Sequence, residues 1–252
     1  GLKALTNLNG KTFSQSPNCL DSTLQTRIED KKLNIYILKS STPLPVIYEL
    51  FDRINTGGTP LNRQEVRHCI FKGKSTTLLK ELAEQAYFKA AIDNGVSPMR
   101  MKDREIILRY LAFRILGVSA YDGDLSGFVE RAMEHINKMS DVEVEALKVD
   151  FKRVMEWSYR LFAAANFRYP VRNAEGEVTG RGFINTSIFE SICLFLSNRT
   201  DVYLQQHQTQ IARNFQTLLQ DPTYTDAVRF STGSKFRVLN RFRLAEEFLT
   251  KE

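Results

Sequence analysis

Apolar residues recur along most of this chain at the three- and four-residue spacing of amphipathic helices. In the longest such pattern, Leu147, Phe151 and Val154 share one side of a helix. Helices are predicted over 18–28, 75–92, 103–117, 124–138, 143–166, 185–197, 202–219 and 235–250. Residues 186–196 are apolar nearly all round, so we expect that helix to be central and buried.

Two regions have β character. Residues 33–39 alternate in part and are rich in β-forming types, which predicts a short strand near the N-terminal end. Segments 168–171 and 178–183 flank a turn at 173–176, which predicts a β-hairpin near 168–183. The expected fold is therefore mainly α, a multi-helix assembly with one N-terminal strand and a small hairpin.

The strand predicted at 33–39 has no neighbouring strand in the sequence. Because strands need partners, it either pairs with the distant hairpin or belongs to a sheet upstream of Gly1. The chain begins with glycine and not methionine, which favours the second arrangement and a chain processed, tagged or cut from a longer one. We expect two domains, 1–74 with the strand and 75–252 with the helices.

A glycine-rich elbow joins two of the predicted helices. An apolar stripe over 47–54 runs up to Gly57 and Gly58, which adopt positive φ without strain and end the first helix. Asn62 with Glu65 three residues later predicts a capping box at the start of the second helix. On that helix the predicted polar face is Gln64, Arg67 and His68, and the predicted apolar face is Val66, Cys69 and Ile70.

Charge and cysteine content set only broad limits on function. The net charge of +6 permits an anionic partner such as nucleic acid or nucleotide, although many proteins without one are equally basic. Three scattered cysteines argue against a disulfide framework and for a reducing compartment. No stretch approaches the roughly 20 apolar residues of a membrane helix, and no signal peptide is visible, so a cytoplasmic location without membrane contact is expected.

Several segments together carry a family resemblance. They are Leu8-Asn9-Gly10-Lys11-Thr12-Phe13, the strand region 33–39, Phe51-x-Arg53-Ile54-Asn55-Thr56-Gly57-Gly58-x-x-Leu61-x-x-Gln64-Glu65-x-Arg67, Met101-Lys102-Asp103-x-Glu105, Leu108-Arg109-Tyr110-Leu111-Ala112-Phe113 and Phe230-Ser231-Thr232-Gly233. In these the sequence resembles the GmrSD-type restriction family, whose N-terminal part is ParB/sulfiredoxin-like. The likeness covers the region after the family's D-G-Q-Q-R motif.

The resemblance implies a nucleotide-dependent protein that defends against modified phage DNA. The intact family is expected to be an NTP-dependent nuclease or NTP hydrolase that uses a nucleoside triphosphate with a divalent metal. The residues implied to shape one wall of its nucleotide pocket are Arg53, Asn55, Gly57, Gly58, Gln64, Glu65 and Arg67. The alternative is a stiff helix–turn–helix corner whose polar groups satisfy each other.

This chain departs from the family in two respects. The D-G-Q-Q-R motif and the histidine-and-asparagine nuclease motif are both absent, so no catalytic residue and no cofactor of its own are expected here. The implied partners are a missing upstream ParB-like domain, DNA, and a nuclease domain in trans. The three histidines lack ligand-like spacing to the cysteines, so no metal site is predicted.

Basic residues on the last predicted helix are the candidate nucleic-acid contacts: Lys235, Arg237, Arg241 and Arg243. Arg237 and Arg241 are one turn apart and could bind phosphate groups together. A solvated basic face is the alternative. Elsewhere, Arg109 shares a face with apolar residues and is expected to point inward, where it needs a carboxylate such as Glu105. Glu190, on the buried helix, is expected to have a structural role.

The leading prediction is thus the helical C-terminal portion of a GmrSD-like protein. Two alternatives stay open: a non-catalytic helical nucleic-acid-binding module, and a scaffold that docks a partner through its exposed strand edge. A steep salt dependence of DNA binding would favour the first, and co-purification with an upstream fragment would favour the second.

Overall fold

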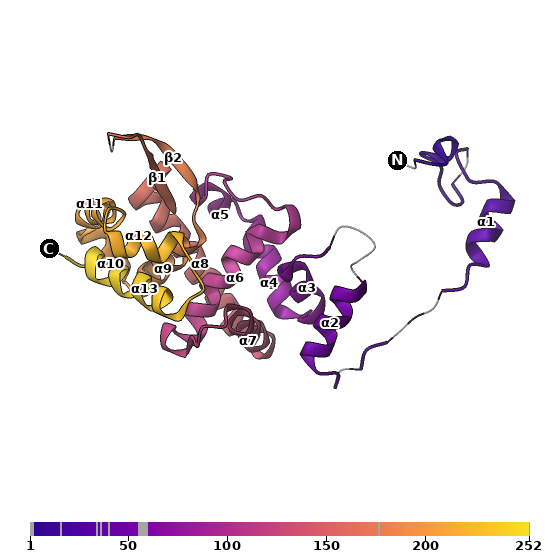
Figure 1. Ribbon diagram of the computed structural model, residues 1–252, viewed down its shortest axis with the longest axis horizontal. Coiled ribbons are helices and arrows are strands. Elements are labelled where there is room, and N and C mark those ends of the chain that lie inside the picture. Colours follow the sequence, from indigo (N-terminus) through magenta and orange to yellow (C-terminus); the bar gives the residue numbers. More distant parts are fainter. Residues whose placement is uncertain are drawn as a thin grey trace. The chain divides into compact units, whose positions relative to one another are not determined.

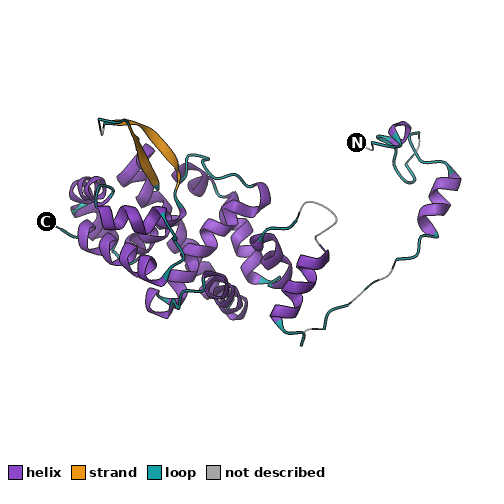
Figure 2. Ribbon diagram, in the orientation of Figure 1, coloured by secondary structure: helices purple, strands orange, loops and turns teal. Residues whose placement is uncertain are grey.

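The computed structural model describes residues 3–15, 17–33, 35, 37–39, 41–54, 60–175 and 177–251. The chain divides into a smaller unit, residues 1–54, and a larger unit, residues 55–252. The domain boundary predicted at 74 lies inside the larger unit. The helix just before that boundary, residues 63–70, is hydrogen-bonded to the rest of this unit. Helices dominate the structure and make up 67% of it (Figure 2).

The smaller unit contains α1 (Ser22–Glu29) and α2 (Leu44–Ile54). The side chain of Asp21 caps α1 by accepting a hydrogen bond from the backbone N–H of Leu24 at 3.0 Å. The described residues of the predicted strand, 33, 35 and 37–39, are not in a strand. The sheet of the described chain consists of the two hairpin strands alone, so this segment has no ladder partner.

The larger unit is a helical body with one hairpin (Figure 1). Its helices are α3 (Arg63–Ile70), α4 (Lys74–Glu84), α5 (Ala86–Ala91), α6 (Lys102–Leu116), α7 (Leu125–Lys138), α8 (Asp141–Phe162), α9 (Thr186–Ser197), α10 (Asp201–Gln206), α11 (Gln208–Leu218), α12 (Pro222–Arg229) and α13 (Lys235–Leu249). The strands are β1 (Arg168–Arg172) and β2 (Val178–Ile184), which pair antiparallel with Arg168 opposite Ile184. The mainly α fold and the hairpin are confirmed.

Helix α9 lies at the centre of the core, as its all-round apolar pattern predicted. It packs against α6, α8, α12 and α13. The side chains of Ile188, Phe189 and Ile192 are fully buried. The rings of Phe189 and Phe167 are in tilted contact, with centroids 4.6 Å apart and planes at 57°. Burying a side chain of this size contributes about 1.5–3 kcal/mol, so α9 is a main source of the stability of the larger unit.

Two predicted helices are each divided in the structure. The pattern over 75–92 becomes α4 and α5, because Gln85 adopts an extended backbone with ψ of 139°. The pattern over 202–219 becomes α10 and α11, separated at His207. Helix α12 was not predicted, although Asp221 followed by Pro222 is a recognisable helix start.

Candidate functional site

Three of the predicted pocket residues, Asn55, Gly57 and Gly58, lie outside the described residues. Their contribution to a nucleotide pocket therefore stays a prediction. Arg53 is in the last turn of α2, in the smaller unit, and forms an ion pair with Glu49 one turn earlier. Both side chains of this pair are exposed to solvent.

Asn62 and Glu65 form the predicted capping box at the start of α3. The Asn62 side-chain oxygen accepts from the backbone N–H of Glu65 at 2.9 Å. In return, the Glu65 carboxylate accepts from the backbone N–H of Asn62 at 2.7 Å. A reciprocal pair of this kind satisfies two of the N–H groups that a helix start leaves unbonded, so the entry into α3 has a fixed direction.

Arg100 ties this cap to the start of α6. Its Nη2 and Nε donate to the Glu65 carboxylate at 3.0 and 3.3 Å, and its Nη2 also donates to the carbonyl of Pro60. Asn62 Nδ2 donates to the Arg100 carbonyl at 2.8 Å. The bond from Arg100 holds the pKa of Glu65 below its usual value. We call Asn62, Glu65 and Arg100 the α3 latch.

The backbone at the far side of the latch is strained. Arg100 and Met101 both adopt the left-handed conformation, with φ of 60° and 59°. For a residue other than glycine this costs roughly 1–2 kcal/mol. Such conformations persist where surrounding contacts determine them, and the hydrogen bonds of the α3 latch supply those contacts at Arg100.

Gln64 and Arg67, on the predicted polar face of α3, point inward. They are 1% and 5% exposed. Arg67 Nη1 donates to Gln64 at 3.3 Å, and Arg67 Nη2 donates to the Ser126 hydroxyl of α7 at 3.1 Å. Arg67 Nε also lies 3.6 Å from the Glu130 carboxylate. The physical reason is that α7 offers polar partners, so these side chains brace α3 against α7, and Cys69 is exposed instead.

The predicted nucleic-acid contacts prove to be largely engaged within the protein. Arg237 donates twice to Asp226, at 2.7 and 3.2 Å, and Arg243 donates to Glu247 on the same helix at 2.6 and 2.7 Å. Arg241 is 0% exposed, so the prediction that it binds phosphate from the surface is wrong. Lys235 is exposed, and the described chain gives it no acidic partner.

A buried triad of charges joins three helices. The Glu190 carboxylate of α9 accepts from Arg109 of α6 and from Arg241 of α13. Arg241 Nη1 also donates to the Thr232 carbonyl at 2.6 Å. The inward orientation of Arg109 and the structural role of Glu190 are confirmed, but Glu190 takes the place of Glu105 as the partner. Sequence reasoning missed the inward orientation of Arg241, although this residue falls between the buried Val238 and Ala245 on one helix face.

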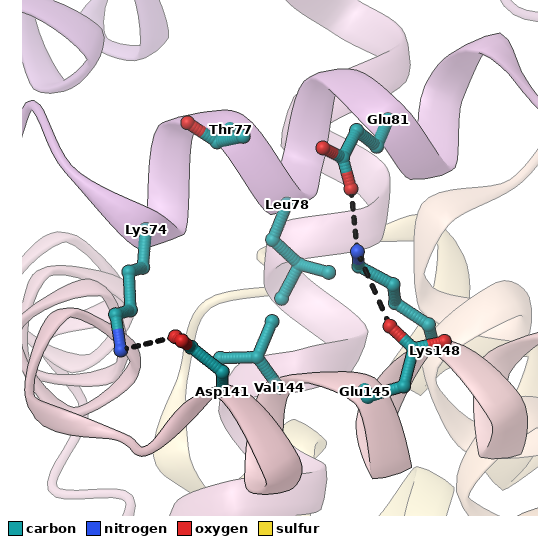
Figure 3. Close-up of a pocket in the computed structure, with 8 residues that line it drawn as sticks. All are labelled: Lys74, Thr77, Leu78, Glu81, Asp141, Val144, Glu145 and Lys148. Carbon is teal, nitrogen blue, oxygen red and sulfur yellow. Dashed lines mark ion pairs between the residues drawn. The ribbon is translucent and has the colours of Figure 1, made fainter.

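A cleft between α4 and α8 is lined by lysines and carboxylates that form ion pairs (Figure 3). Lys74 Nζ lies 2.6 Å from Asp141, and Lys148 Nζ lies 2.7 Å from Glu81 and 3.4 Å from Glu145. The hydrogen bond to Glu81 raises the pKa of Lys148. Both lysines already have a carboxylate partner, and the three carboxylates outnumber them by one, so this cleft has no unpaired cation to offer an anionic ligand.

Among the described residues, no group of histidine, cysteine, aspartate and glutamate is arranged to hold a metal ion. Across the same residues, every helix is too short or too polar to span a lipid bilayer.

Burial lowers the pKa of His68 on α3, and the positive charges of Arg104 and Lys72 lower that pKa further.

Comparison with known proteins adds no relative from which to assign the chain. No protein-family model, no curated protein and no solved structure matches it. The features that bear on function are therefore the motif around the elbow and the contacts that hold α3.

Proposed function

We propose that this chain is the helical portion of a GmrSD-like, nucleotide-dependent restriction or phage-defence protein. In this role it supports one wall of a nucleotide pocket that an upstream ParB-like domain completes. The observation that carries the proposal is the α3 latch, which begins directly after the glycine-rich segment. A pocket wall has to be held by residues that are themselves fixed, and Asn62, Glu65 and Arg100 fix this one from two helices.

The start of α3 itself does not fit a triphosphate. Glu65 already occupies the helix start and accepts hydrogen bonds that a phosphate would otherwise accept. The catalytic groups, the phosphate contacts and any divalent metal are therefore assigned to the upstream domain. Contact with DNA would use Lys235 as its least engaged cation, with a nuclease supplied in trans.

The first test is the intact mass of the product of the natural open reading frame. A longer product that contains D-G-Q-Q-R supports the proposal, and nucleotide hydrolysis by that product can then be compared between variants. Arg100→Ala removes the latch, and we expect about a hundredfold loss of kcat/KM, since small misplacements of reacting groups have effects of that size.

The matched control for Arg100→Ala is Arg114→Ala, which breaks an ion pair between α6 and Asp150 of α8, away from the latch. Both variants are checked for folding by circular dichroism. Normal hydrolysis by folded Arg100→Ala would remove the latch from the mechanism, and a natural product without nucleotide binding would remove the proposed function.

A second candidate function, docking of a partner protein, is favoured by one observation. In the smaller unit, Leu33, Ile35 and Ile37 are 78%, 77% and 85% exposed. Apolar side chains at alternate positions suit addition to the edge of another sheet. Replacing all three by serine should abolish co-purification with an upstream fragment if this candidate is correct.

A further inference from the structure

A cavity of about 490 Å³ lies between the start of α6, the end of β2 and the start of α9. Its polar lining consists of Ser97, Lys102, Glu105, Arg109 and Thr186. The size falls within the range of about 300–1,000 Å³ typical of small-molecule sites. All of its lining residues belong to the larger unit, and none belongs to the predicted nucleotide pocket.

Arg109 lies at the wall of this cavity with part of its hydrogen-bonding capacity unused. Its Nε donates to Glu190, but its Nη2 is buried and has no hydrogen-bond partner within the described chain. Buried side-chain donors without an acceptor are rare in folded proteins. The Arg109 side chain as a whole is 13% exposed and lines the cavity, so an acceptor brought by a ligand would meet the guanidinium there.

The charges around Arg109 leave one positive charge unmatched. Glu190 is a single carboxylate shared by two arginines, Arg109 and Arg241, so the buried triad has a net charge of +1. Thr186 lies one helical turn before Glu190, so its hydroxyl is on the same face of α9. The inner end of the cavity therefore offers a guanidinium and a hydroxyl to an anion.

The outer end of the cavity carries opposite charges. Lys102 and Glu105 both line it, and the described residues provide neither of them with an ion-pair partner. Glu105 would repel a second anionic group but would accept a hydrogen bond from a hydroxyl group. A ligand with one negative charge and a polar, uncharged body matches both ends.

We propose that this cavity binds a small monocarboxylate with hydroxyl substituents. The carboxylate lies against Arg109 and Thr186, and the hydroxyl groups reach Lys102 and Glu105. One carboxylate balances the single excess charge of the triad, which a phosphate dianion would overcompensate. This inference is independent of the proposed nucleotide function.

Saturation-transfer NMR on the full chain tests the proposal, with gluconate as the probe, acetate as a competitor and glycerol as the uncharged comparison. We expect gluconate to bind, acetate to displace it, and glycerol to give no signal. Lys102→Gln and Thr186→Val should each weaken gluconate binding about tenfold, the loss typical of one hydrogen bond to a charged group. Both positions lie at the edge of the fold, so the variants should remain folded.

Lys80→Gln is the control, because Lys80 is an exposed lysine of α4 outside the cavity. It should leave gluconate binding unchanged. Equal binding of gluconate and glycerol, or unaltered binding by both cavity variants, would overturn the proposal. Displacement of gluconate by inorganic phosphate at lower concentration than by acetate would overturn the assignment of the ligand as a carboxylate.

Discussion

Replacing Glu190 with glutamine should destabilise the larger unit by about 3–5 kcal/mol, the range measured when one member of a buried ion pair is removed. Glu190 and Arg241 are both 0% exposed, and Arg109 is 13% exposed. Glutamine keeps the shape of the side chain but has one oxygen to accept with in place of two. Its amide group would then face one of the guanidinium groups, donor against donor.

Urea denaturation followed by circular dichroism measures this loss. For a domain of 150–250 residues, a change of 1 kcal/mol moves the Tm by about 2–4 °C, so a decrease of about 6–20 °C is expected in a thermal scan. The matched control is Glu247→Gln, which removes the carboxylate of an exposed pair on α13. Exposed pairs contribute about 0–1 kcal/mol, so the control should unfold almost as the wild type does.

A loss below about 1 kcal/mol for Glu190→Gln would refute the reasoning, because it would mean that the two arginines reach water or another carboxylate. A triple variant with methionine at 109, 190 and 241 provides a second measurement. Well-packed apolar residues can replace a buried charge network at little cost. The triple variant should therefore be more stable than Glu190→Gln alone.

Three further outcomes are expected. Because the pKa of Glu65 is lowered in the folded protein, its contribution is present above its unfolded pKa and is lost as the pH falls through the folded value, so the stability difference between wild type and Glu65→Gln should vanish at low pH. A Cβ at Gly182 would meet the Tyr169 carbonyl oxygen at 2.6 Å, whereas one at Gly180 would meet Val171 only at 4.0 Å. Gly182→Ala should thus destabilise by about 1–3 kcal/mol and Gly180→Ala should not, as thermal unfolding would show. Burial raises the pKa of the Cys193 thiol well above its ordinary value, so a thiol reagent should label exposed Cys69 and leave Cys193 unmodified until urea unfolds the chain; rapid labelling of Cys193 would contradict its burial.

Periodicity was sufficient to predict most of the helical body. Helix α9 and its burial followed from an apolar run, and the capping box followed from Asn62 and Glu65. The divisions at Gln85 and His207 could not be predicted, because an apolar pattern continues across a break when both pieces pack against the same core. Helix boundaries there are decided by tertiary contacts.

The candidate site was less predictable, because polar residues take their orientation from partners distant in sequence. Arg67 points inward for Ser126 and Glu130, and Arg100, which has no part in the elbow motif, completes the cap of α3. A basic pattern on α13 suggested a nucleic-acid surface, yet Arg241 is buried by its pairing with Glu190. Residue type indicated chemistry in each case, and only the three-dimensional contacts decided which side of the helix faced solvent.

The α3 latch has a consequence for how the protein opens in its native state. The start of α3 is hydrogen-bonded to Arg100, two residues before α6, and the left-handed backbone at Arg100 is retained by the same contacts. Fraying of the start of α3 would therefore release the segment that leads into α6. The amide protons at the two starts should accordingly exchange with deuterium as one cooperative unit, at a common rate, although 35 residues separate Glu65 from Arg100 along the chain.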